Sequence, residues 1–174
     1  FVNGNGDNDT ITVTGALIGS TVEGGKGNDT LANSSTIATS LLQGRFGVDT
    51  ITVTGTTTNS TVNGNEDDDT ITLTGLVKGS KVYGGKAEDT ITAAEVNSTA
   101  ILGNLGDDNI TVTGALDTVT INGNDGTDTI AVSSATAVKA SVYGGAGRDT
   151  INLTGAGALY VSGDAANDNI SIGT

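Results

Sequence analysis

Residues 82–91 read Val-Tyr-Gly-Gly-Lys-Ala-Glu-Asp-Thr-Ile, and the frame of this stretch returns along the whole chain every 19 to 21 residues. The frame has an aliphatic residue seven positions before an aspartate, a glycine five positions before it and an aliphatic residue two positions after it. We call this aspartate the anchor aspartate of its repeat. The anchors are Asp9, Asp29, Asp49, Asp69, Asp89, Asp108, Asp128, Asp149 and Asp168. Three columns matched nine times establish a tandem repeat.

Each repeat carries the patterns of two β-strands. After the anchor, polar and aliphatic residues alternate, as in Thr70-Ile71-Thr72-Leu73-Thr74, which predicts a strand with one buried face. A second short strand precedes the glycine turn, as in residues 80–83. The differences in repeat length fall between these two strands, which predicts a tolerant loop on that side. The many β-branched residues and glycines argue against helix.

Identical coils of this kind stack so that equivalent residues lie above one another in parallel ladders. The aliphatic columns then form a continuous inner seam. We therefore predict an all-β fold, a parallel, β-roll-like β-solenoid of nine coils of about 20 residues. Residues 1–174 are expected to form a single continuous solenoid. Because the chain starts in mid-repeat, we also expect it to be a segment of a longer array.

The composition fits a thin core repeated many times. Aromatic residues make up only 3% of the 174 residues, 27 residues are glycine, and cysteine is absent. The net charge of −13 argues against a nucleic-acid partner, because phosphate-binding surfaces are basic. No apolar run approaches the length of a membrane span, so no membrane insertion is expected.

The acidic residues gather in the glycine turns. Seventeen of the twenty lie within five-residue stretches that end at an anchor aspartate. Stacking brings these like charges within several ångströms of one another, and a bound cation would offset their repulsion. Ca²⁺ suits such a turn because it takes six to eight oxygen ligands from carboxylates and carbonyls. Glycine also permits the positive φ angles that would aim turn carbonyls at the ion.

A family resemblance supports calcium. Residues 24–31, Gly-Gly-Lys-Gly-Asn-Asp-Thr-Leu, and residues 144–151, Gly-Gly-Ala-Gly-Arg-Asp-Thr-Ile, match the Gly-Gly-x-Gly-x-Asp-x-apolar pattern of RTX calcium β-rolls. One motif per 20 residues, rather than one per nine, is more similar to the one-sided calcium solenoids of large bacterial adhesins. The resemblance implies that the anchor aspartates supply side-chain ligands and neighbouring glycine carbonyls supply the rest. The predicted calcium ligands are Asp7, Asp9, Asp29, Asp49, Asp67, Asp69, Asp89, Asp107, Asp108, Asp128, Asp149 and Asp168.

Two alternatives to calcium remain open from the sequence. Lys26, Arg45, Lys86 and Arg148 lie in the same turns and could neutralise the aspartates without metal. Each anchor aspartate could also accept backbone N–H groups in an Asx-type turn and bind no metal. The coils with extra acids next to the anchor are the best calcium candidates, and they contain Asp7, Asp67 and Asp107.

The alternating strands place threonine on the outer face. Positions equivalent to Thr10, Thr12 and Thr14 repeat down the rod, and such an array resembles the faces of β-solenoid antifreeze proteins. Ice binding is therefore an alternative function. Threonine is, however, a common outward strand residue, and Ala32 and Ala131 interrupt the array.

The repeat argues against an enzyme. The chain has no histidine or cysteine, and every turn carboxylate belongs to a repeated column, whereas active sites are singular. We expect an extracellular or cell-surface structural rod, secreted by a prokaryote, as part of a surface fibre, surface layer or giant adhesin. Its expected partners are itself, by end-to-end stacking or continuation of the array, and glycans or cell-surface polysaccharide. A second alternative is a non-catalytic calcium-roll module of a secreted enzyme.

Overall fold

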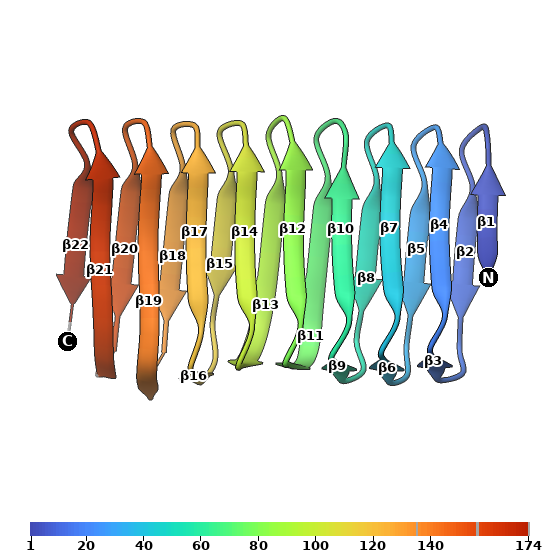
Figure 1. Ribbon diagram of the computed structural model, residues 1–174, viewed down its shortest axis with the longest axis horizontal. Coiled ribbons are helices and arrows are strands. Elements are labelled where there is room, and N and C mark those ends of the chain that lie inside the picture. The colour runs from blue at the N-terminus through green and yellow to red at the C-terminus, as the bar shows by residue number, and fades with distance from the viewer. Residues whose placement is uncertain (135, 156, 174) are drawn as a thin grey trace.

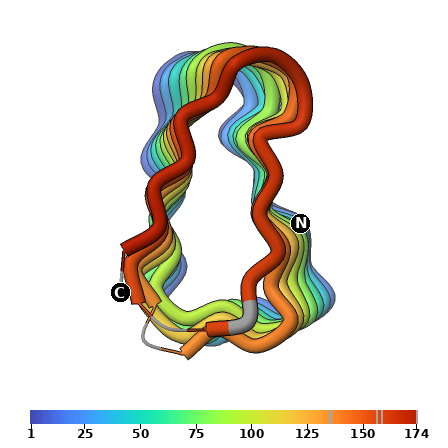
Figure 2. Tube along the Cα trace, turned by 90° about the vertical axis from the view of Figure 1, so that its left-hand side faces the viewer, coloured from blue at the N-terminus to red at the C-terminus, as the bar shows by residue number. Residues whose placement is uncertain are grey.

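The computed structural model describes residues 1–134, 136–155 and 157–173, and these residues wind into a parallel β-solenoid of about eight turns. The predicted all-β solenoid is confirmed, and its number of turns is close to the nine coils predicted from the repeats. The described residues contain no helix. Figure 1 shows the coils side by side along the long axis, with the glycine turns in one row at the top. Figure 2, a view along the rod, shows a long, three-sided cross-section.

The first long face consists of the strands that lead into the glycine turn. They are β1 (Val2–Asn5), β4 (Thr21–Lys26), β7 (Leu41–Phe46), β10 (Thr61–Asn65), β12 (Lys81–Lys86), β14 (Ala100–Leu105), β17 (Thr120–Asp125), β19 (Ala137–Ala146) and β21 (Gly157–Ala165). Each strand pairs in parallel with its counterparts in the neighbouring coils, and Val62 of β10 lies opposite Val82 of β12. Repeats of equal length thus produce exact stacking of like residues on this face.

The second long face consists of the strands that follow the anchor aspartates. They are β2 (Thr10–Val13), β5 (Thr30–Asn33), β8 (Thr50–Val53), β11 (Thr70–Lys78), β13 (Thr90–Asn97), β15 (Asn109–Val112), β18 (Thr129–Ser133), β20 (Thr150–Thr154) and β22 (Asn169–Gly173). Their pairing is also parallel and in register, with Ile71 opposite Ile91. Alternate residues of each strand therefore enter the core, as the sequence pattern predicts.

The segment predicted as a tolerant loop carries a third, short face, so that part of the prediction is wrong. Four two-residue strands lie there: β3 (Leu17–Ile18), β6 (Ile37–Ala38), β9 (Thr57–Thr58) and β16 (Leu116–Asp117). In other coils the long strands β11, β13 and β19 extend into this side. The length changes are absorbed beside these strands, and the β11–β13 register shifts between Leu73 and Leu76.

The core is a stack of aliphatic layers. Ile51, Ile71 and Ile91 are fully buried in one column, and Val62 and Val82 are fully buried in another. Four aliphatic columns converge from the three sides, two of them from the second long face, so small side chains suffice to fill the space between them. In the outermost repeats, Val2 and Ile170 belong to the same columns but are each 42% exposed.

Candidate functional site: the glycine turn and its aspartate ladder

Every glycine turn contains two residues with left-handed backbone conformation. They lie four and two positions before the anchor aspartate. The first set is Asn5, Gly25, Arg45, Asn65, Gly85, Asn104, Asn124, Gly145 and Asp164, and the second is Asp7, Gly27, Gly47, Asp67, Ala87, Gly106, Gly126, Gly147 and Ala166. Glycine, asparagine and aspartate dominate both sets because they tolerate this conformation best. These paired residues bend the chain back and turn the anchor side chain inward.

The glycine five positions before each anchor serves a different purpose. Its φ angle is not positive in any coil, and the positive φ angles expected of turn glycines belong to other positions, such as Gly25 and Gly27. Instead, a Cβ atom added to Gly84 would collide with Oδ2 of Asp89 and would come within 2.8 Å of the carbonyl oxygen of Gly103. The equivalent glycine of every coil meets its own anchor carboxylate in the same way. The glycine therefore leaves room for the aspartate, which explains why the two residues recur together.

The anchor aspartates form a hydrogen-bonded ladder inside the solenoid. The backbone N–H of each anchor donates to Oδ1 of the anchor in the next coil, for example from Asp49 to Asp69 at 2.7 Å and from Asp69 to Asp89 at 2.8 Å. The series runs unbroken from Asp9 to Asp168, with distances of 2.7 to 3.0 Å. One oxygen of each carboxylate thus joins two coils.

The second carboxylate oxygen is buried without a hydrogen-bond partner. This holds for Oδ2 of eight anchors among the described residues: Asp9, Asp29, Asp49, Asp69, Asp89, Asp108, Asp128 and Asp149. The central anchors are almost fully buried, with 0 to 2% of the residue exposed from Asp29 to Asp149. An ionised carboxylate in such a place is unfavourable, because water cannot solvate it.

Burial therefore raises the pKa of these carboxyl groups. The pKa of Asp69 rises to about 8, those of Asp89 and Asp108 to about 7, and those of Asp49 and Asp128 to about 6. Repulsion from the neighbouring anchors adds to the effect of burial, and the N–H of the preceding anchor opposes it. The middle of the ladder is accordingly held partly protonated near neutral pH.

A second ladder runs along the outside of the turn in the opposite direction. Here the side chain one position before the anchor accepts the backbone N–H of the next coil. Asn8 accepts from Asn28 at 2.8 Å, and Asp68 accepts from Glu88 at 3.0 Å. This ladder is incomplete, because Val48 offers no acceptor.

The three acids predicted beside the anchors lie on this exposed side. Asp7, Asp67 and Asp107 are all exposed. Oδ2 of Asp67 accepts the N–H of Gly47 at 3.0 Å, and Oδ1 of Asp107 accepts that of Thr127 at 2.7 Å. The structure thus separates the predicted calcium ligands into two groups: nine anchors inside the solenoid and three acids outside.

The two groups differ in their fit to calcium. An anchor such as Asp89 already uses Oδ1 for a backbone N–H, and its Oδ2 is buried against the glycine five positions before it. The exterior acids each retain a free oxygen on an open surface. Within the described ranges, no three acidic side chains converge in a geometry that would hold a metal. The anchor carboxylates accept backbone N–H groups, as in one of the alternatives that the sequence left open. The donor, however, lies in the neighbouring coil. Calcium binding itself stays a prediction.

A third ladder, not predicted from the sequence, lies at the opposite corner. The backbone N–H of Ser40 donates to Oγ of Ser60 at 3.1 Å, and Ser60 repeats this toward Ser80 at 3.2 Å. The series extends from Ser20 to Thr99, and the buried aliphatic residue Val119 takes the next position. A 20-residue recurrence of serine is the signal that could have revealed it.

The threonine columns lie on the outer surface of the second face. Thr50, Thr70 and Thr90 are exposed, while Thr52 and Thr72 are half-buried between their neighbours. Ala32, Ala131 and Asn152 interrupt these columns, and ice binding stays an alternative prediction.

The described residues contain no helix long and apolar enough to cross a membrane. Comparison with protein-family models, with curated proteins and with solved structures gives no match to this chain. The fold and its ladders define the class instead: a tandem-repeat parallel β-solenoid with interior hydrogen-bonded side-chain columns.

Proposed function

We propose that the chain is an extracellular structural rod, a segment of a surface fibre, surface layer or giant adhesin, and that it is not an enzyme. The observation that carries this proposal is the unbroken aspartate ladder. It joins every coil to the next through a buried side chain, so the turns act as one continuous brace along the rod. Since each coil contacts mainly its neighbours, such an array can lengthen without a change of design.

The polarity of the ladder is compatible with self-association. The anchor N–H always donates toward the C-terminal neighbour, so Asp168 presents an N–H at one end and Asp9 presents a carboxylate at the other. Val2 and Ile170 carry the aliphatic columns of the core into the first and last coils. Stacking the first coil of one copy on the last coil of another would continue both the ladder and the core.

End-to-end stacking can be tested on the 174-residue segment. We expect light scattering to show growing rods as concentration rises, and electron microscopy to show filaments one solenoid wide. Ile172→Lys, which places a charge at a 66% exposed residue of the last strand, should return the protein to monomers. Leu105→Lys, at a 47% exposed residue of β14 in the middle of the rod, is the matched control and should leave filaments intact. A wild-type segment that stays monomeric at high concentration would exclude this mode of assembly.

Calcium is part of the proposal, at the exterior acids of the middle coils. Asp67, Asp68 and Asp107 lie on the exposed side of the turns, and the charges of Asp67 and Asp107 also raise the pKa values of nearby anchors. A divalent cation there would reduce repulsion both outside and inside the turn. Because the interior ladder braces the coils without metal, we propose that calcium adds stability rather than enabling folding.

Removal of calcium should therefore lower the melting temperature without abolishing the β-sheet circular dichroism spectrum. The expected loss on chelation is about 2–5 °C, which corresponds to roughly 1 kcal/mol for a chain of this size. The double variant Asp67→Asn/Asp107→Asn should lose the response, and Asp117→Asn, on the opposite side of the coil, should keep it. A melting temperature that calcium leaves unchanged would remove the ion from the proposal.

A further inference from the structure

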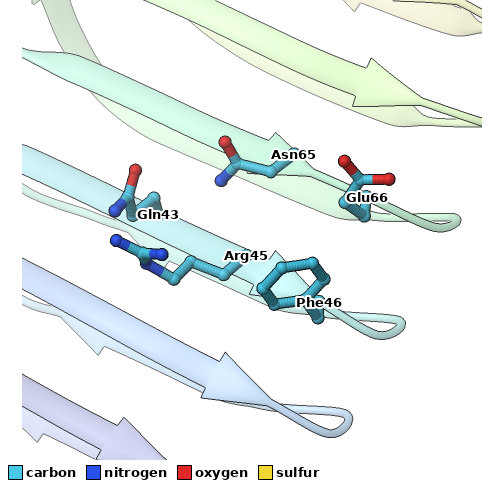
Figure 3. A pocket seen from close by; sticks show the side chains of 5 residues that line it. All are labelled: Gln43, Arg45, Phe46, Asn65 and Glu66. Atoms are coloured by element: carbon cyan, nitrogen blue, oxygen red, sulfur yellow. The ribbon is translucent and has the colours of Figure 1, made fainter.

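The outer face of β4, β7 and β10 departs from the repeat in one place. Two shallow grooves of about 190 and 260 Å³ meet there, and Arg45 and Phe46 line both of them. Gln43, Asn65 and Glu66 complete the first groove. Figure 3 shows these five side chains together on one surface: Gln43, Arg45 and Phe46 from β7, Asn65 from the adjacent β10, and Glu66 from the turn that follows β10.

Arg45 occupies a backbone position that disfavours it. Its φ angle is 92°, and the equivalent positions of the other coils carry only glycine, asparagine or aspartate. A bulky residue in the left-handed region costs on the order of 1 kcal/mol or more. The turn conformation therefore does not explain why this residue is arginine, and we look for the reason in the contacts of its side chain.

A buried carboxylate holds the Arg45 side chain in place. Oε1 of Glu23 accepts Nη2 of Arg45 at 3.0 Å and Nε2 of Gln43 at 2.7 Å, and Oε2 accepts Nδ2 of Asn3 at 3.3 Å. Glu23 is only 7% exposed, whereas the Arg45 side chain is 43% exposed. The Glu23 carboxylate thus fixes the guanidinium and neutralises its charge, while the outer edge of the guanidinium still faces solvent.

Phe46 adds an exposed aromatic surface beside this polar group. It is 48% exposed, and only five residues of the chain are aromatic. At the equivalent position, the neighbouring coils carry Lys26 and Glu66. Glu66 itself pairs with Lys86 at 2.7 Å, so the acids and bases of the patch nearly cancel.

The chemistry of these groups selects a ligand. Fixed amide and guanidinium groups offer donors and acceptors in adjacent pairs, which match neighbouring hydroxyls of a sugar ring. An exposed phenyl ring packs against the apolar face of such a ring. Open, shallow and nearly neutral grooves side by side suit an extended chain rather than a compact charged molecule. We propose that coils 1–4 form a binding site for a neutral oligosaccharide, stacked on Phe46 and hydrogen-bonded by Arg45 and Gln43.

This site deepens the proposed function by giving the rod a polysaccharide ligand, and it can be tested without assembly. The probes are maltohexaose, cellohexaose and mannohexaose, titrated into the isotopically labelled, monomeric Ile172→Lys segment. We expect at least one of them to shift the NMR signals of the Arg45 side chain and the Phe46 ring, with a dissociation constant on the order of 1 mM.

Two variants separate binding from folding. Arg45→Gly relieves the left-handed strain but removes the cation paired with the buried Glu23 carboxylate, so these two effects on the melting temperature oppose each other. Its affinity should fall at least fivefold, and its circular dichroism spectrum should stay that of the folded parent. Phe46→Ala should weaken binding similarly. Leu105→Ala changes the equivalent, 47% exposed position of the sixth coil and should leave the affinity unchanged.

The proposal is overturned if none of the three oligosaccharides shifts these signals at about 10 mM, or if Arg45→Gly and Phe46→Ala bind as well as the parent. Filament formation by the wild-type segment is measured independently. A failure of sugar binding would therefore leave the rod proposal standing, and a failure of assembly would leave the sugar site standing.

Discussion

Gly84→Ala is expected to lower the free energy of unfolding by about 3 kcal/mol or more, although it adds one methyl group. The new Cβ would overlap Oδ2 of Asp89 and crowd Asp89 Cβ and the Gly103 carbonyl oxygen, both at 2.8 Å. None of these atoms can move freely, because Asp89 is tied to the coils on both sides and Gly103 lies in the next strand. Urea denaturation followed by circular dichroism measures the loss.

The control is Gly6→Ala, in the first turn, where an added Cβ meets nothing within 4 Å and φ is not positive. It should change stability by less than about 0.5 kcal/mol. A double-mutant cycle with Asp89→Ala tests the cause: loss of the carboxylate should cost less in the Gly84→Ala background than in the wild type. Equal stability of Gly84→Ala and Gly6→Ala would mean that the glycine does not shield the carboxylate.

The repeat period made much of this fold predictable. With the spacing known, parallel stacking places Ile71 under Ile91 and Val62 under Val82, and the structure confirms both columns. The short third strand escaped prediction because two residues, such as Ile37 and Ala38, are too few to show alternation. The residues of this strand nevertheless recur in every coil, so the repeat period alone could have predicted a third face.

The orientation of the anchor aspartate could not be read from its residue type. An aspartate in a glycine-rich turn is ordinarily a solvated residue or a metal ligand, and the resemblance to calcium rolls favoured the second reading. What turns Asp89 inward is the pair of left-handed residues before it, Gly85 and Ala87. A hint did exist: Gly84 keeps its place in every repeat while other turn residues vary, as expected for a steric partner of the aspartate.

Acidification from pH 8 to pH 5 is expected to stabilise the protein, in contrast to the usual behaviour of an acidic chain. In the folded state the pKa of Asp69 is about 8 and those of Asp89 and Asp108 are about 7, whereas an unfolded aspartate has a pKa near 3.8. Between these values the folded state binds more protons than the unfolded state, so stability falls as pH rises. The full contribution is present below about pH 4 and is lost progressively up to about pH 8.

Melting temperatures measured from pH 4 to pH 9 without divalent cations test the slope, and we expect a decrease of at least about 5 °C across the range. Asp69→Asn keeps an acceptor oxygen for the N–H of Asp49 and carries no charge, so it should raise the melting temperature at pH 8 and flatten the slope. Asp117→Asn, an exposed acid on the opposite side, should leave the slope unchanged. A melting temperature that instead rises from pH 5 to pH 8 would show that the anchors are stabilised as carboxylates. The interior ladder would then depend on ionised aspartates, and the proposal that protonated anchors join the coils along the rod would be wrong.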